Sequence, residues 1–327
     1  MSLLQSMAST TKMSLSIPTI ARLLGRIAPS YAVFAILLLA LWVLRPAMMS
    51  PMILATFARQ VVPLGLVVLG QLLVISVRSI DLSAGGIILT VNYLISSGLL
   101  AHYAPSTVVA LSLAIGLAVG MVNGLLIGKR RASAVIVTLA INIALVGLIE
   151  YLANGTPPGD VPSVYRDIYN LRPFGIPAPL LFWLFIAAMM SLLLGGTVFG
   201  RYTAAIGSNP LAAHFAGVPV ERTVILSHVV AGFMFALAGL VQTASIAVGS
   251  VRFGPELVMN SIAATILGGV IFGRGAGVLG PFVGVLCFAL LFVVMTSLGI
   301  QEAGKLIAQG GIILLAAIFY GVKRQNN

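Results

Sequence analysis

The chain has 327 residues, of which 60% are hydrophobic and 8% are charged, and its formal net charge is +11. A soluble domain carries about 25% charged residues because polar groups must cover its surface, so this composition excludes a soluble fold. The basic residues form no long run with interleaved aromatics, which argues against a nucleic-acid partner. We therefore predict an integral membrane protein whose apolar surface contacts membrane lipid.

The apolar segments predict an all-α, polytopic bundle. Inside lipid, only helices and closed barrels satisfy every backbone polar group. The apolar runs are continuous for about 15–22 residues and lack the alternation of barrel strands, so helices are favoured. In chain order, we expect ten spans at about residues 30–45, 60–77, 84–101, 107–127, 133–153, 179–199, 223–248, 258–272, 278–297 and 305–322.

The distribution of Lys and Arg predicts the orientation. We interpret residues 1–29 as a cytoplasmic lead-in, 30–322 as the transmembrane domain with an inner loop at 200–222, and 323–327 as a cytoplasmic tail. With the N-terminus inside, most Lys and Arg fall in inner segments, as the positive-inside rule requires. Ten spans then place both termini in the cytoplasm, and a five-plus-five division makes the two halves inverted.

A glycine ridge marks the fourth predicted span. Gly116, Gly120, Gly124 and Gly128 recur at four-residue spacing, which aligns them on one helix face. Such a ridge lets another backbone approach closely. We expect tight packing within the subunit, with a subunit interface as the alternative.

Enzyme signatures are missing from the sequence. Residues 275–280 match GxGxxG, but they join two predicted spans rather than a strand and a helix, so no dinucleotide cofactor is expected. His102, His214 and His228 are scattered without zinc-ligand spacing, and we interpret them as loop or packing residues rather than metal ligands. No carboxylate lies convincingly in mid-membrane, which favours a transporter that draws its energy from elsewhere. We therefore predict no enzyme activity, cofactor or metal.

The inner loop 200–222 predicts a short helix between the sixth and seventh spans. Asn209 can cap it, and Pro210 suits its first position. Leu211–Ala216 would form the helix, and Gly217 would end it.

Two apolar residues of this helix have the spacing of a docking surface. Leu211 and Phe215 form an i,i+4 pair on one side of the helix. The helix is either a connector without a partner or a rigid element that docks into a groove of a cytoplasmic protein.

Four segments carry a resemblance to a known family. They are GRYTAAIGSNPLAAHFAGVPVERTVILSHVVAGFMFALAGL at 200–240, IDLSAGGIILT at 80–90, ASAVIVTLAINIALVGL at 132–148 and SIAATILGGVIFGRGAGVLGPFVG at 261–284. In this order and spacing they resemble the permeases of the ribose-type family of bacterial ABC importers. The chain departs from the family pattern at Arg78–Ser79, Ala134 and His214.

The resemblance implies a ten-span permease of the type II importer fold in the bacterial inner membrane. It implies an ABC ATPase below the membrane, a periplasmic binding protein that delivers a sugar, and a second permease subunit, identical or different. It also implies that the helix between spans six and seven docks on the ATPase. Here that helix maps onto Asn209, Pro210, Leu211, Ala212, Ala213, His214, Phe215 and Gly217.

Polar residues inside the spans are the candidates for the solute pathway. We expect them to face the bundle interior, because each is costly against lipid; the alternative for each is an interhelical hydrogen bond. They are Asn92, Asn123, Thr138, Asn142 and Gln242.

Asp81 is the stronger functional candidate, because an uncompensated carboxylate near the membrane is expensive. It would pair with Arg78 or cap the third span. Arg78, Gly269 and Arg274 join it as gating or structural candidates. The main alternative to an importer subunit is a stand-alone secondary transporter of a small polar solute, and a third possibility is a membrane scaffold.

Overall fold

The computed structural model describes residues 29–251, 254–270 and 277–325. The predicted lead-in, apart from Pro29, and the candidate Arg274 lie outside these ranges. Within them the chain is helical, and its only extended pairing is an isolated bridge between Asp160 and Val248. The prediction of an all-α fold is therefore confirmed.

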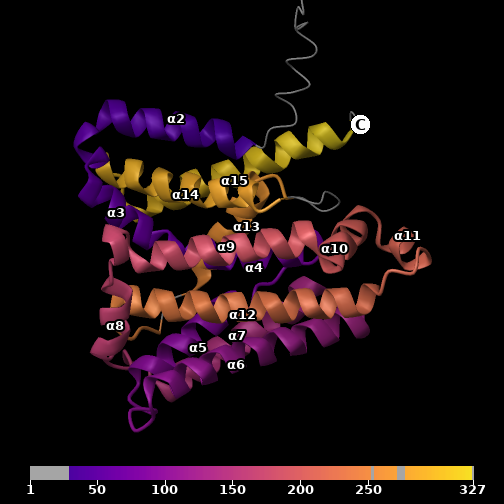
Figure 1. Cartoon of the computed structure of the whole chain (residues 1–327), viewed down its shortest axis with the longest axis horizontal. Helices are drawn as coiled ribbons and strands as arrows, with labels where there is room; N and C mark the ends of the chain where they lie inside the picture. Colours follow the sequence, from indigo (N-terminus) through magenta and orange to yellow (C-terminus); the bar gives the residue numbers. More distant parts are fainter. Residues whose placement is uncertain (1–28, 252–253, 271–276, 326–327) are drawn as a thin grey trace, which may run out of the picture.

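The helices follow one another with short connections (Figure 1). In chain order they are α2 (Pro29–Leu44), η1 (Pro46–Met49), α3 (Pro51–Gln60), α4 (Val62–Ser76), α5 (Ala84–Ser96), α6 (Pro105–Gly124), the π-helical turn η2 (Leu125–Lys129), α7 (Ala134–Leu152), α8 (Ser163–Asn170), η3 (Pro173–Gly175), α9 (Ala178–Gly196), α10 (Val198–Ser208), α11 (Pro210–Phe215), α12 (Val220–Ile246), α13 (Pro255–Leu267), α14 (Leu279–Ser297) and α15 (Glu302–Gln325).

Each of the ten predicted spans overlaps a helix, namely α2, α4, α5, α6, α7, α9, α12, α13, α14 and α15. Among the described residues, 5 helices are long and apolar enough to cross a membrane: α6 with η2, α7, α9, α12 and α14. The count is 6 if α3 and α4, which are bent by 41° at their junction, form one span. The chain is thus a multi-pass membrane protein, while ten spans and the sidedness of the termini stay predictions.

Helix α4 lies at the centre of the bundle. It packs against α9, α12, α13 and α14. Every residue from Val62 to Ser76 is buried, which explains why this helix is apolar all round rather than on one face. Outside this centre, α12 also packs on α5 and α6, and α14 packs on α2.

The two ends of the bundle differ. Figure 1 shows α3 and α8 at one end and α10 and α11 at the other. In the predicted orientation, the α3 end is the outer side and the α11 end faces the cytoplasm.

The glycine ridge of α6 packs against another helix of the same subunit, as the four-residue spacing predicts. A Cβ at Gly116 would collide with the carbonyl oxygen of Gly232, and one at Gly120 with that of His228. At Gly124 the obstacle would be the backbone of Ile225. All three obstacles belong to α12, so the ridge lets the α6 and α12 backbones touch.

A methyl group on this ridge should push the two helices apart. We expect Gly120→Ala to destabilise the protein by about 1–3 kcal/mol, because overpacking strains a close-packed contact. The matched control is Gly147→Ala on α7, where an added Cβ meets nothing within 4 Å. That change should be neutral or stabilising by up to about 1 kcal/mol. Thermal unfolding of the two purified variants checks this, and equal melting temperatures would contradict the packing.

Candidate functional site

The short helix α11 begins with the cap that the sequence predicts. The Asn209 side-chain oxygen accepts hydrogen bonds from the backbone N–H groups of Leu211 and Ala212, at 3.0 and 3.1 Å. Pro210 occupies the first helical position, where its missing N–H costs nothing. The start of α11 is therefore fixed by local chemistry.

The end of α11 is fixed in the same way. Gly217 has a φ of +81°, and its N–H donates to the carbonyl of His214 at 3.0 Å. The N–H of Val218 donates to the carbonyl of Ala213, also at 3.0 Å. This pattern is a glycine-terminated helix end with its last carbonyls satisfied.

One face of α11 is anchored and the other is free. Ala213 is buried in a cluster with Val77, Ile206 and Val224, which come from the end of α4, from α10 and from α12. On the other side, Leu211 is 65% exposed and Phe215 is 81% exposed. The helix thus presents two large apolar side chains from a rigid base.

Arg78 holds the segment that precedes α11. Its Nε donates to the carbonyl oxygen of Gly207 at 2.8 Å, and its Nη2 to that of Ser208 at 2.7 Å. A cation at the last carbonyls of α10 is favourable because the C-terminus of a helix carries partial negative charge. Arg78 therefore makes these bonds, and the pair with Asp81 that the sequence suggested is not formed.

Asp81 is buried in the connection between α4 and α5, with an exposure of 0%. Its Oδ1 accepts from the backbone N–H of Ser83 at 2.9 Å and from the Ser83 hydroxyl at 2.6 Å. Its Oδ2 lies 3.2 Å from Nδ2 of Asn123 on α6 and 2.9 Å from Nδ1 of His228 on α12. The carboxylate thus joins the start of α5 to two other helices.

His228 connects this carboxylate to a second polar group. Its ring is buried, and its Nε2 lies 2.9 Å from the hydroxyl oxygen of Ser79. An ionised carboxylate only accepts, so Nδ1 donates to Asp81, and in the neutral ring Nε2 accepts from Ser79. This pairing is not predictable from the sequence, because the two residues are 147 positions apart. The available signal was an ionisable residue inside an apolar span.

Two more candidates satisfy backbone groups around the start of α5. The Thr138 hydroxyl oxygen accepts from the N–H of Leu82 at 3.0 Å, and the Asn142 side-chain oxygen accepts from the N–H of Gly86 at 2.7 Å. The first N–H groups of a helix have no partner within it, so α7 supplies these acceptors. Asn123, Thr138, Asn142 and Asp81 therefore gather at one place.

Asn92 and Gln242 do not join this cluster. The Asn92 amide nitrogen lies 3.3 Å from the hydroxyl oxygen of Thr243 and 3.3 Å from the carbonyl oxygen of Val248, towards the other end of α12. Gln242 is half-buried on α12. Gly269, with a φ of +91°, ends α13. Four of the five candidates make hydrogen bonds within or between helices, which is the alternative role considered for them. The role of all five in the solute pathway stays a prediction.

A family model described as "Branched-chain amino acid transport system / permease component" matches residues 53–317. The chain belongs to this permease family. It is 31% identical over 286 residues to the ribose import permease protein RbsC of Bacillus subtilis (strain 168), covering 86% of this chain and 89% of that one. It is 35% identical over 209 residues to the L-arabinose transport system permease protein AraH of Escherichia coli (strain K12), covering 62% of each. No solved structure matches the chain.

Family membership makes the chain a membrane permease subunit rather than an enzyme. The described residues contain no group of three or more His, Cys, Asp or Glu side chains that could hold a metal ion. The buried network around Asp81 and the exposed face of α11 are the two candidate features for the role of such a subunit.

Removing the carboxylate should test the network. We expect Asp81→Ala to destabilise the permease by about 3–5 kcal/mol, because His228 and Asn123 lose their buried partner. Asp81→Asn keeps the size and one acceptor, so its effect should be smaller. The control is Asp167→Ala on the exposed face of α8, which should stay within about 0.5 kcal/mol. A melting temperature for Asp81→Ala equal to that of the control would contradict the network.

Proposed function

We propose that this permease is the membrane-spanning subunit of an ATP-binding-cassette importer that carries a sugar by alternating access. A separate ATPase supplies the energy, a periplasmic binding protein delivers the sugar, and a second permease subunit completes the path. In this proposal the chain crosses the bacterial inner membrane ten times, with both termini cytoplasmic and two inverted halves. Residues 200–222 are the coupling loop of the 30–322 transmembrane domain.

The observation that carries this proposal is α11, in a chain whose relatives are sugar permeases. Leu211 and Phe215 are large, apolar and exposed on a helix that is capped at both ends. Figure 1 shows α11 projecting beyond the end of the bundle. Short apolar helices of this kind bind in a groove of a partner, and a rigid helix loses little entropy when it docks.

The contacts of Arg78 suggest how a movement of the docked α11 would be transmitted to the transmembrane helices. Motion of α11 would act on the end of α10, whose carbonyls Arg78 binds. Three positions further along the chain, Asp81 holds α5 together with α6 and α12. A shift of α11 would therefore favour one of two arrangements of these helices, which is how packed bundles switch.

The sugar assignment follows the relatives, which are named for ribose and L-arabinose. A stand-alone, proton-coupled carrier is the second candidate, because the buried Asp81–His228 pair has the groups that a proton relay needs. The two functions differ in one requirement, since only the importer needs an ATPase.

Affinity purification of the chain from its host in mild detergent separates the two. We expect a stoichiometric ATPase to copurify and to be lost in Phe215→Asp. The new carboxylate would lose its water in the apolar groove of the ATPase without gaining a partner, which is costly. The matched control is Phe174→Asp, which changes a 98% exposed Phe on η3, in the connection between α8 and α9. This variant should retain the ATPase.

Two results would contradict the importer assignment. One is a purified chain without an ATPase that transports solute in liposomes under a proton gradient. The other is an ATPase that stays bound to Phe215→Asp while Phe174→Asp loses it.

A further inference from the structure

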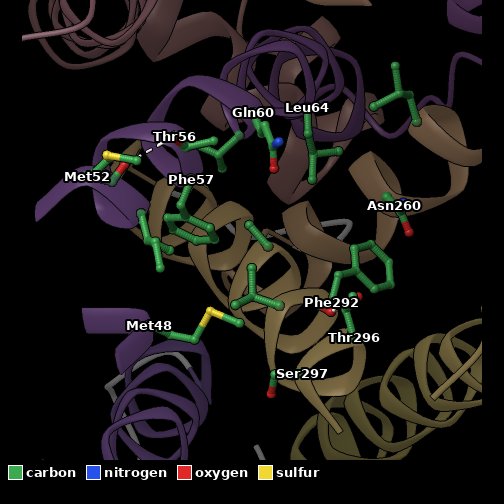
Figure 2. A pocket seen from close by; sticks show the side chains of 15 residues that line it. Met48, Met52, Thr56, Phe57, Gln60, Leu64, Asn260, Phe292, Thr296 and Ser297 are labelled. Carbon is green, nitrogen blue, oxygen red and sulfur yellow. Dashed lines mark hydrogen bonds between the residues drawn. The ribbon is translucent and has the colours of Figure 1, made fainter. Parts of the chain in front are cut away.

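A cavity of about 550 Å³ lies between α3, α4, α13 and α14, with Met48 of η1 at its edge (Figure 2). This volume is within the range of small-molecule sites, about 300–1,000 Å³. The cavity is at the α3 end of the bundle, opposite α11, and is separate from the Asp81 network. The polar residues in its wall are Thr56, Gln60, Asn260, Thr296 and Ser297.

The side chain of Asn260 indicates that the cavity binds a ligand. It is only 7% exposed, it lines the cavity, and its side-chain oxygen has no hydrogen-bond partner among the described residues. A buried oxygen without a partner is costly, and native proteins keep few of them. An occupant of the cavity that donates a hydrogen bond to Asn260 would remove this cost.

The other polar groups present more acceptors. The hydroxyls of Thr56, Thr296 and Ser297 donate to main-chain carbonyls of their own helices at 3.0, 2.7 and 2.7 Å, which leaves their oxygens free to accept. Figure 2 shows the Gln60 amide directed into the space. Phe57 and Phe292 contribute aromatic surface to the same wall.

Among the residues that the structure describes, none that lines the cavity is charged. An amino acid would bring an ammonium and a carboxylate group into this cavity without a counterion, and burying such charges unpaired is expensive. A neutral sugar brings hydroxyls that donate and accept, and C–H faces that pack on aromatic rings. The cavity therefore favours a sugar over the branched-chain amino acids for which the family is named.

A smaller cavity of about 220 Å³ shares Thr56 and Gln60 with the first and leads to polar groups of α8. There Arg59 Nη1 donates to the side-chain oxygen of Asn170 at 3.1 Å, and its guanidinium lies 5.9 Å from the ring centre of Tyr169. A solute arriving at this end would meet polar groups first and the neutral cavity next.

We propose that the larger cavity is a binding station for a neutral sugar in the outer half of the permease, with Asn260 and Gln60 bound to its hydroxyls. This inference rests on the proposed function and adds the place where the sugar binds and the residues that recognise it. A lipid chain or a second copy of the permease are the competing occupants, and both would exclude polar reagents from the cavity.

Cysteine labelling of the full chain in right-side-out membrane vesicles tests the proposal. Ala289→Cys, at a position that lines the cavity and has no assigned contact with the sugar, should react with the neutral reagent 2-hydroxyethyl methanethiosulfonate about tenfold faster than Phe185→Cys, because only a water-accessible thiol reacts readily. Phe185 is the control because it is 61% exposed on α9, where lipid would cover it. The native Cys287 is buried. D-ribose or L-arabinose should slow the labelling of Ala289→Cys severalfold, and L-leucine should not.

Three results would overturn the proposal: labelling as slow as that of Phe185→Cys, no protection by either pentose, or protection by L-leucine alone. If the chain binds its ATPase but gives one of these results, the cavity is not a sugar site, and the importer function is unaffected. A chain that copurifies with no ATPase refutes the importer function itself.

Asn260→Leu separates recognition from folding. Because the Asn260 oxygen has no protein partner to lose, this variant should keep the melting temperature of the unmodified chain. Its ATP-dependent pentose uptake should fall about tenfold, as the loss of one hydrogen bond to the solute predicts. A lower melting temperature with unchanged uptake per folded molecule would show a structural role and overturn the assignment.

Discussion

A buried carboxylate is the constraint on which the α11 half of this permease depends. Asp81 is fully buried, and its charge is tolerable only because Ser83, Asn123 and His228 surround it. These donors come from three separate segments of the chain, so α5, α6 and α12 must meet at one point. The glycine ridge makes this meeting possible, because Gly120 and Gly124 let α6 lie directly on the α12 backbone beside His228.

The same region connects to the end of the bundle that carries α11. Arg78 precedes Asp81 by three positions and binds the last carbonyls of α10, and only Asn209 separates α10 from α11. The two contacts place the base of α11, the proposed docking helix, and the junction of α5, α6 and α12 on one short stretch of backbone. The cavity at the other end is separate from this stretch, which suits the proposed importer, because its solute site and its energy input would then be at opposite ends.

What the sequence could predict was encoded locally. Apolar runs predict the helices, and Asn209, Pro210 and Gly217 predict the limits of α11, because hydropathy and capping depend on neighbours in the chain. The partners of Asp81 were not predictable, since His228 is 147 positions away. Asn260 carried the same signal as the candidates chosen, a polar residue in an apolar span, but only the packing of α3, α4, α13 and α14 shows which residues line a cavity.

Hydrogen exchange of the intact importer, with and without ATP, tests most directly whether docking reaches the Asp81 network. The account predicts that ATP changes the exchange of residues 205–217 and of residues 78–86 together, because Arg78 and Asp81 link them. It would be contradicted if ATP altered exchange in residues 205–217 alone and left residues 78–86 unchanged.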